Sequence, residues 1–151
     1  MRYGRSERLL VLIAIVSLLA MSCSGVQRPP ANPLEVLTSV SLDPSEAKTG
    51  EEVVVTIALE NQTEQDIVLN FGNQQQVGFR VSTPRGKLLV EQPTWFQPAP
   101  SALVLSANNG RSFDITLVTK DLAPGTYIVQ GGILGSEATY PWGSVILKIK
   151  R

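Results

Sequence analysis

The sequence predicts a small all-β domain, an antiparallel sandwich of roughly seven to nine strands. Three observations support this fold class. From Leu34 onward, apolar residues recur at every second position, which is the period of a strand with one buried face. Turn-forming Gly, Pro, Asn and Asp residues separate these runs. After the leader no ten-residue stretch has helical periodicity, which excludes the crossover helices of a doubly wound α/β fold.

Five strands are expected in the first half of the domain. The strongest is 53–60, in which four apolar side chains face one way while Thr56, Ala58 and Glu60 face the other. Gly50 closes the turn that precedes it, and polar or Gly-containing turns end each later run. The five expected strands are 34–42, 53–60, 67–71, 77–81 and 87–91.

The second half begins with an irregular stretch and then returns to alternation. Strands are expected at 113–117, at 127–129 and at 145–149, where Lys148 and Lys150 face solvent. Before the middle one, Pro124 and Gly125 form a turn that leads into Tyr127. This resembles the tyrosine corner of immunoglobulin-like folds, in which the phenol bonds the backbone a few residues upstream.

The N-terminus has the features of an export signal. Residues 1–8 are net positive, and the apolar run 9–20 would span only roughly 18 Å as a helix, too short for a bilayer. Ala20, Met21 and Ser22 then lead to Cys23, which resembles the lipobox of bacterial lipoproteins. The resemblance implies cleavage between Ser22 and Cys23 and lipidation of the Cys23 thiol. The alternatives are an ordinary signal peptide with a stray cysteine and an uncleaved anchor.

These features divide the chain into three parts. Residues 1–22 are the expected signal peptide, 23–33 a lipidated, proline-rich tether, and 34–151 the sandwich domain. Cys23 is the only cysteine, so lipidation also explains the odd thiol of an exported protein. The expected location is a bacterial membrane surface outside the cytoplasm, either the outer membrane or the outer face of the plasma membrane.

Composition excludes several kinds of chemistry. The chain has no histidine and its one thiol is expected to be lipidated, so nucleophilic triads and zinc sites are not expected. The carboxylates cluster at strand ends and turns, where charges are usually solvated, and neither catalysis nor a metal is expected of them. Gly131-Gly132 precedes no helix and is interpreted as a bulge or a close backbone approach. No basic patch suggests nucleic acid as a partner, and no cofactor is expected.

The central and C-terminal segments resemble the intracellular proteinase inhibitor (BsuPI) family of immunoglobulin-like domains. The matching text lies between Ser41 and Ile133, and Gly78 stands where an acidic residue is expected before the phenylalanine. The resemblance implies an immunoglobulin-like sandwich and inhibition of a proteinase, and it transfers no inhibitory residue. The segments that carry it are VVVTIALEN (53–61), IVLNFG (67–72), VGFRV (77–81), GK (86–87), WF (95–96), LAPGTY (122–127) and GGI (131–133).

The stretch 91–106 is the strongest candidate for a binding loop. Trp95 and Phe96 are adjacent there, and prolines that include Pro98 and Pro100 restrict the backbone. A rigid aromatic loop loses little entropy on binding, although the rings could instead close one end of the core. Tyr140 and Trp142 are a second candidate, either as a turn packed on the sandwich or as part of the same aromatic surface.

Three functions are consistent with these observations. The preferred hypothesis is a non-enzymatic module that presents the sandwich to an extracytoplasmic protein or envelope polymer. The alternative is a proteinase inhibitor that acts through the loop around Trp95. An enzyme of unrecognised type is the third possibility. The oligomeric state is not predicted.

Overall fold

A computed structural model of the chain describes residues 35–93, 99–134 and 140–151. The fold is all-β, and the described residues form ten strands, so the predicted fold class is confirmed. Eight of these strands coincide with the expected runs. The strands are β1 (Val36–Asp43), β2 (Glu46–Lys48), β3 (Glu52–Asn61), β4 (Ile67–Phe71), β5 (Val77–Ser82), β6 (Leu88–Gln92), β7 (Ser101–Leu105), β8 (Gly110–Val118), β9 (Gly125–Ile133) and β10 (Gly143–Lys150).

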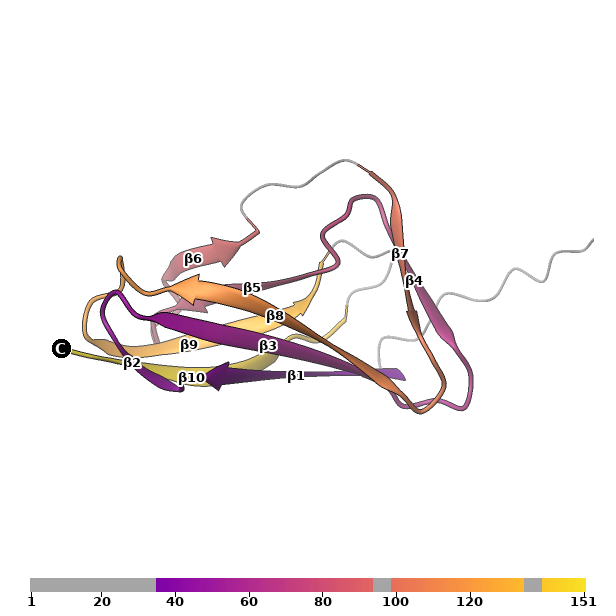
Figure 1. Ribbon diagram of the computed structural model, residues 1–151, viewed down its shortest axis with the longest axis horizontal. Coiled ribbons are helices and arrows are strands. Elements are labelled where there is room, and N and C mark those ends of the chain that lie inside the picture. The colour runs from indigo at the N-terminus through magenta and orange to yellow at the C-terminus, as the bar shows by residue number, and fades with distance from the viewer. Residues whose placement is uncertain (1–34, 94–98, 135–139) are drawn as a thin grey trace, which may run out of the picture.

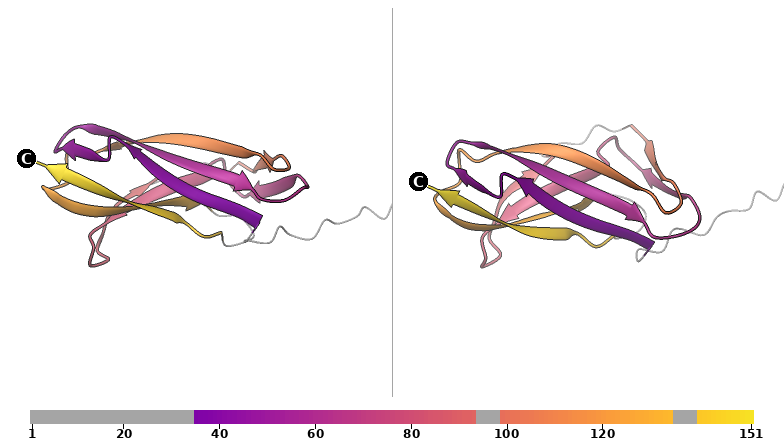
Figure 2. Two further views of the ribbon diagram at one scale, coloured as in Figure 1. Left: turned by 90° about the horizontal axis from the view of Figure 1, so that it is seen from below. Right: turned by 60° about the horizontal axis from the view of Figure 1, so that its bottom comes forward.

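The strands build two packed layers and a short ribbon (Figure 1). One layer has the order β1-β3-β8 and the other β2-β10-β9-β5-β6, and Figure 2 shows them face to face. All pairs are antiparallel except β2 with β10, which is parallel. Strands β4 and β7 pair as a ribbon at the end where β1 begins, opposite the C-terminus.

The expected count of seven to nine strands was too low because two strands give little periodic signal. β2 has three residues and buries only Ala47, so it is too short to show alternation. β7 lies inside the stretch 91–106, whose prolines predict an irregular segment. Its Leu103 and Leu105 face the core while Val104 is exposed, an alternation that follows the last of those prolines, Pro100.

The core lies between the two layers. The inward residues of β3, β5 and β9 form its centre, and Ile57, Phe79 and Val129 are completely buried. Full burial of side chains of this size contributes about 1.5–3 kcal/mol each. Phe113 and Ile115 on β8 complete the core. They are only partly buried because β8 is an edge strand with no neighbour on one side.

A buried amide fastens the end of β3 to two neighbouring loops. Asn61 is 2% exposed, and its Nδ2 donates to the carbonyl oxygens of Gln65, Leu105 and Ser106 at 2.7–3.1 Å. Its Oδ1 accepts from the backbone N and from Oγ1 of Thr63, at 2.9 and 2.8 Å. Asn61, which ends the family-like segment 53–61, therefore has a structural role.

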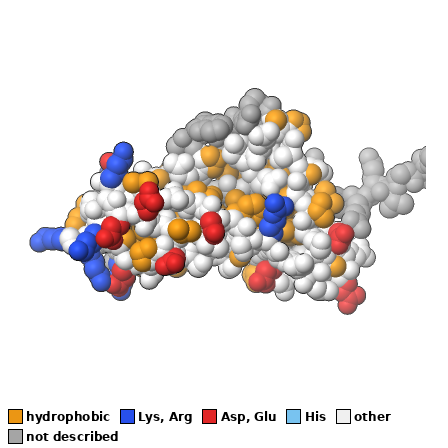
Figure 3. Space-filling model, viewed as in Figure 1, with side chains coloured by type: hydrophobic (Ala, Val, Ile, Leu, Met, Phe, Trp, Pro, Cys, Tyr) orange, Lys and Arg blue, Asp and Glu red, His pale blue; other side chains and the backbone are white. Residues whose placement is uncertain are grey.

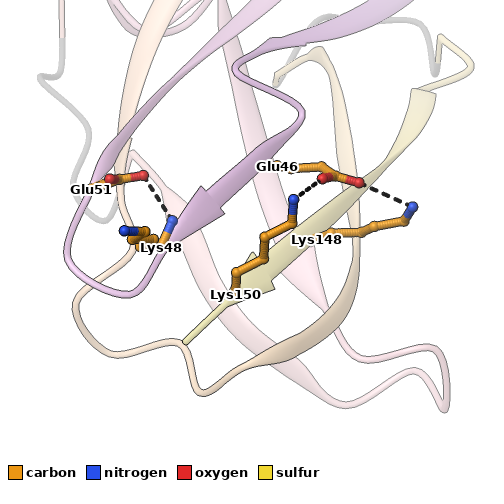
Figure 4. A network of polar contacts seen from close by, with 5 residues as sticks. All are labelled: Glu46, Lys48, Glu51, Lys148 and Lys150. Carbon is orange, nitrogen blue, oxygen red and sulfur yellow. Dashed lines mark hydrogen bonds and ion pairs between the residues drawn. The ribbon is translucent and has the colours of Figure 1, made fainter.

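The end that carries the C-terminus is held by a polar network (Figure 4). Glu46 on β2 forms ion pairs with Lys148, at 3.2 Å, and with Lys150, which both project from β10. These lysines, Lys150 first, hold the pKa of the Glu46 carboxyl below its ordinary value. The same end presents the Lys and Arg side chains that gather at one tip in Figure 3. Because these groups are exposed, they add little to stability and mainly align β2 beside β10.

The turn before β9 has the geometry of a tyrosine corner. Tyr127 is buried, and its hydroxyl donates to the carbonyl oxygen of Ala123 at 2.6 Å, four residues upstream. Pro124 and Gly125 lie between the two bonded groups and make the turn, and both are exposed. The phenol therefore fixes the start of the strand that pairs with both β10 and β5.

We predict that Asn61→Ala lowers the free energy of unfolding by about 2–4 kcal/mol, because it leaves carbonyl groups without their donors. Asn61→Asp should have a similar effect, since it places carboxylate oxygens against carbonyl oxygens. Urea denaturation of each variant measures the change. The exposed neighbour Gln62 is the control, and Gln62→Ala should remain within about 0.5 kcal/mol of the parent. Equal stability of Asn61→Ala and the parent would contradict the structural role.

Candidate binding face on the five-stranded sheet

The residues predicted for lipidation and for the binding loop are only partly visible. Ser22, Cys23, Trp95, Phe96 and Pro98 lie outside the described residues, and so do the expected signal peptide and tether. Pro100 is described and is exposed immediately before β7. The placement of Trp95 and Phe96, inward or outward, therefore stays a prediction.

The second aromatic candidate separates into a buried and a surface residue. Tyr140 is 4% exposed and belongs to the core cluster. Burial, followed by the negative charge of Glu35, raises the pKa of its hydroxyl. Trp142 is partly exposed and lies on the outer face of the five-stranded sheet, against Gly132. Only Trp142 is therefore available to a ligand.

Around Trp142 the strand registers place outward-facing residues in three rows. The first row is mainly apolar, the second is polar, and the third consists of two glycines, one of which, Gly132, lies against Trp142. The rows are Leu88, Ser82, Ile128 and Ile146; then Glu91, Arg80, Gln130 and Ser144; then Gly78 and Gly132. We call these three rows, together with Trp142, the binding face.

The centre of the binding face is a stacked pair. The guanidinium carbon of Arg80 lies 4.2 Å from the ring centroid of Trp142, within the range of a cation–π interaction. Arg80 is half-buried, and its Nε is buried without a hydrogen-bond acceptor. The planar guanidinium is thus held in one orientation by the ring, while its hydrogen-bonding capacity is not fully used.

The absence of a side chain at position 132 makes room for this pair. A Cβ at Gly132 would lie 2.6 Å from Cδ1 of Trp142, closer than real Cβ contacts allow, so the indole can lie on the strand only because position 132 has no side chain. The interpretation of this site as a close backbone approach agrees with that geometry.

At Gly78 a Cβ would collide with the carbonyl oxygen of Gln92 and lie 2.7 Å from Cδ1 of Leu134. The acidic residue expected there from the family pattern has no space in this chain.

Exposed apolar side chains lie along one side of the stacked pair. Ile146 on β10 is 57% exposed, and Leu88 and Leu89 on the edge strand β6 are 49% and 40% exposed. Single exposed apolar residues are ordinary, but here they lie on one face beside a tryptophan and an arginine. Trp and Arg are the residues most enriched at the energetic centres of protein interfaces.

The other surface features support weaker interpretations. A polar hollow lined by Glu60, Asn61, Asn108 and neighbouring residues lies at one end of the sandwich, but Asn61 is already committed to structural hydrogen bonds. Within the described ranges, no group of three or more acidic, histidine or cysteine residues could hold a metal ion. No helix in these ranges is long and apolar enough to cross a membrane.

The arrangement is suited to binding. Sequence reasoning identified Trp142 but did not identify Arg80 as its partner. Arg80 occupies an ordinary polar position of an alternating strand, and its partner is 62 residues away, so periodicity gives no signal for the pair. The nearest signal was the glycine pair 131–132, which was interpreted as a bulge or a close backbone approach and did not indicate which group approaches.

Fold and face together define an immunoglobulin-like β-sandwich with a candidate binding surface on its larger sheet. The sequence matches the family described as intracellular proteinase inhibitor, BsuPI, over residues 40–138, about two thirds of the chain. The chain belongs to this family, which is one of inhibitors rather than enzymes. A comparison with curated proteins found no match.

Solved structures with similar folds differ widely in function. The C-terminal domain of Wzt has a TM-score of 0.50 and 16% identity, with 82% of this chain and 83% of that one covered. The alkylpurine DNA glycosylase AlkC from Pseudomonas fluorescens has a TM-score of 0.51 and 16% identity over 78% of this chain, which spans 31% of AlkC. The CARDB domain of a Pyrococcus furiosus protein has a TM-score of 0.46 and 8% identity, covering 76% of this chain and 94% of that one. The first two likenesses show the fold alone.

We predict that adjacent glycines of β9 respond differently to alanine. Gly131→Ala should lower the free energy of unfolding by about 1–3 kcal/mol, because its Cβ would lie 2.9 Å from Cγ1 of Ile57 in the core. Gly132→Ala should displace Trp142 and change the near-ultraviolet circular dichroism, with a smaller loss of stability. Gly72→Ala is the control, since nothing lies within 4 Å of its Cβ position. Unchanged dichroism in Gly132→Ala would contradict the described packing.

Proposed function

We propose that this chain is a non-enzymatic binding module, anchored by lipid to a membrane surface outside the cytoplasm, that holds a protein partner on the binding face. The observation that carries the proposal is the Arg80–Trp142 pair, with unused hydrogen-bonding capacity and exposed apolar neighbours. Partner proteins commonly bury such a pair at the centre of an interface and leave a polar rim around it.

The position of the pair on a sheet favours recognition over catalysis. Arg80 and Gln130 belong to strands that are hydrogen-bonded on both sides, so the backbone beneath the pair is rigid. A preorganised surface loses little conformational entropy when a partner binds.

A proteinase as the partner is the second candidate, and family membership over residues 40–138 favours it. In that case the chain would inhibit the enzyme by occupying its cleft, either with the stretch that contains Trp95 and Phe96 or with the binding face. Inhibition is a special case of binding, and the two candidates differ in whether a target loses activity.

The membrane anchor rests on the leader. The positive residues 1–8, the short apolar run 9–20 and the following Cys23 are the parts of a lipoprotein signal. Two or more acyl chains on one residue hold a protein stably at a bilayer, whereas one chain binds marginally. The described domain begins next to this segment, at residue 35.

We predict that the full chain retains a protein from envelope extracts and that Trp142→Ala loses it, with affinity reduced at least about tenfold, which is about 1.4 kcal/mol. Leu37→Ala is the control, because Leu37 is a large apolar residue that is exposed, at 54%, on the opposite layer. Quantitative affinity capture measures the difference. Identical sets of retained proteins for Trp142→Ala and the parent would refute the binding face.

We predict, for the second candidate, stoichiometric loss of activity in at least one member of a panel of serine proteinases and metalloproteinases. Paired variants locate the contact: Trp95→Ala with Phe96→Ala tests the loop, and Trp142→Ala tests the binding face. If no proteinase loses activity at micromolar concentrations of the chain, the inhibitor function is excluded for the panel. The capture experiment with Trp142→Ala still tests the binding module in that case.

We predict that Cys23→Ala abolishes acyl labelling and moves the protein from the detergent phase to the aqueous phase in phase partitioning. Ser22→Ala keeps a small residue before the cysteine and should leave both properties unchanged. Detergent partitioning of Cys23→Ala equal to that of the parent would disprove a lipid anchor at this residue.

A further inference from the structure

We propose that Arg80 receives a single carboxylate of the partner, supplied by an aspartate or glutamate side chain or by a chain terminus, with an apolar residue beside it. This inference rests on the proposed function and specifies what the binding face recognises. The pair of Arg80 and Trp142 is the recognition element, and the apolar row with Ile128 and Ile146 receives the neighbouring residue.

The first step in the argument is that Arg80 has a charge without a partner. Guanidinium groups remain protonated at all physiological pH values. Among the described residues, the ion pairs are those of Glu46 with Lys148 and Lys150, and none involves Arg80. The interaction found for Arg80 is with the Trp142 ring, and its buried Nε has no acceptor.

The second step is that the ring fixes the guanidinium for one type of ligand. The Trp142 ring lies 4.2 Å from the guanidinium carbon of Arg80 and limits its movement, and the N–H donors of a guanidinium lie in its plane, so hydrogen bonds form at its edges. Planar carboxylates match such an edge with two parallel hydrogen bonds. A lysine in this position could not offer that geometry.

The third step is that local charge limits the ligand to one negative charge. Within the three rows Arg80 is the sole cation, and the exposed Glu91 lies directly opposite it on β6. Lys148, two residues beyond Ile146 on β10, is already paired with Glu46. A phosphate dianion or an acidic polymer would bring two or more negative charges beside Glu91 with no second cation to compensate, whereas a single carboxylate brings only one, which Arg80 can pair directly.

The fourth step concerns the residue that carries or adjoins the carboxylate. Ile128 and Ile146 are directly opposite each other on β9 and β10, one row from Arg80, and Ile146 is more than half exposed. Leu88 continues this row at the other end, on β6. An apolar residue adjacent to the carboxylate would cover this row and shield the charged hydrogen bonds from water.

The test uses the full chain in the non-ionic detergent dodecyl maltoside, with Trp95→Phe so that Trp142 is the fluorescence reporter. The probes are acetyl-Ile-Glu-Ile-amide and its Gln counterpart, acetyl-Ile-Ile with a free carboxylate and its amide, and inorganic phosphate. We expect each carboxylate probe to bind at least about tenfold more tightly than its neutral counterpart. The two pairs of probes distinguish a side-chain carboxylate from a terminal one.

Variants assign the effect to Arg80. Arg80→Gln should abolish the preference for the carboxylate, and Arg80→Lys should retain only a small part of it. Ile146→Ser should weaken charged and neutral probes by the same factor. Because a variant could be destabilised, the ¹⁵N–¹H signal of the Arg80 Nε in the unsubstituted chain gives an independent measurement, and carboxylate probes should shift it.

Equal affinity for charged and neutral probes, an unshifted Nε signal, or tighter binding of phosphate than of the Glu peptide would each overturn the carboxylate site. Failure of the proposed function would look different. In that case the carboxylate preference would be present, but Trp142→Ala would retain the same envelope proteins as the parent. If Trp142→Ala loses the envelope partner but charged and neutral probes bind equally, the proposed binding face stands and only the carboxylate proposal fails.

Discussion

The register of β9 between β10 and β5 is the constraint on which both the core and the binding face depend. Alternation along this strand points Gly131 at the core and Gly132 at the surface, so a slip by one residue would exchange the two environments. The Tyr127 hydroxyl fixes the strand at its beginning, and hydrogen bonds on both sides fix it along its length. Trp142 and Arg80 can stack only because this register leaves a gap above Gly132.

Membership of an intracellular inhibitor family and the proposed export leader give different indications of where this domain acts. The binding face offers a common explanation, because a sandwich that recognises proteins through a rigid sheet can be used against a proteinase or against another envelope protein. AlkC and the Wzt domain share the sandwich at 16% identity, and the fold alone therefore does not specify what it binds.

The period of two predicted most of the fold because most of the strands bury alternate residues, as β3 and β4 do. It could not predict β2, which has three residues, or β7, which follows several prolines. The site was less accessible to sequence reasoning. Trp142 could be named as an aromatic candidate, but Arg80 looks like any polar residue of an alternating strand. Their contact depends on how β5, β9 and β10 align, and that information lies in long-range pairing and not in local pattern.

The opposite placement of residue 35 and the C-terminus has a mechanical consequence. A pull on the N-terminal segment acts along the axis of β1, whose eight residue pairs with β3 carry hydrogen bonds perpendicular to that axis. All these bonds are then strained together in shear, and they do not open one after another as a zipper would. If the domain is held at its N-terminal end while a partner bound to the larger sheet pulls in the opposite direction, the β1–β3 hydrogen bonds would therefore resist unfolding together.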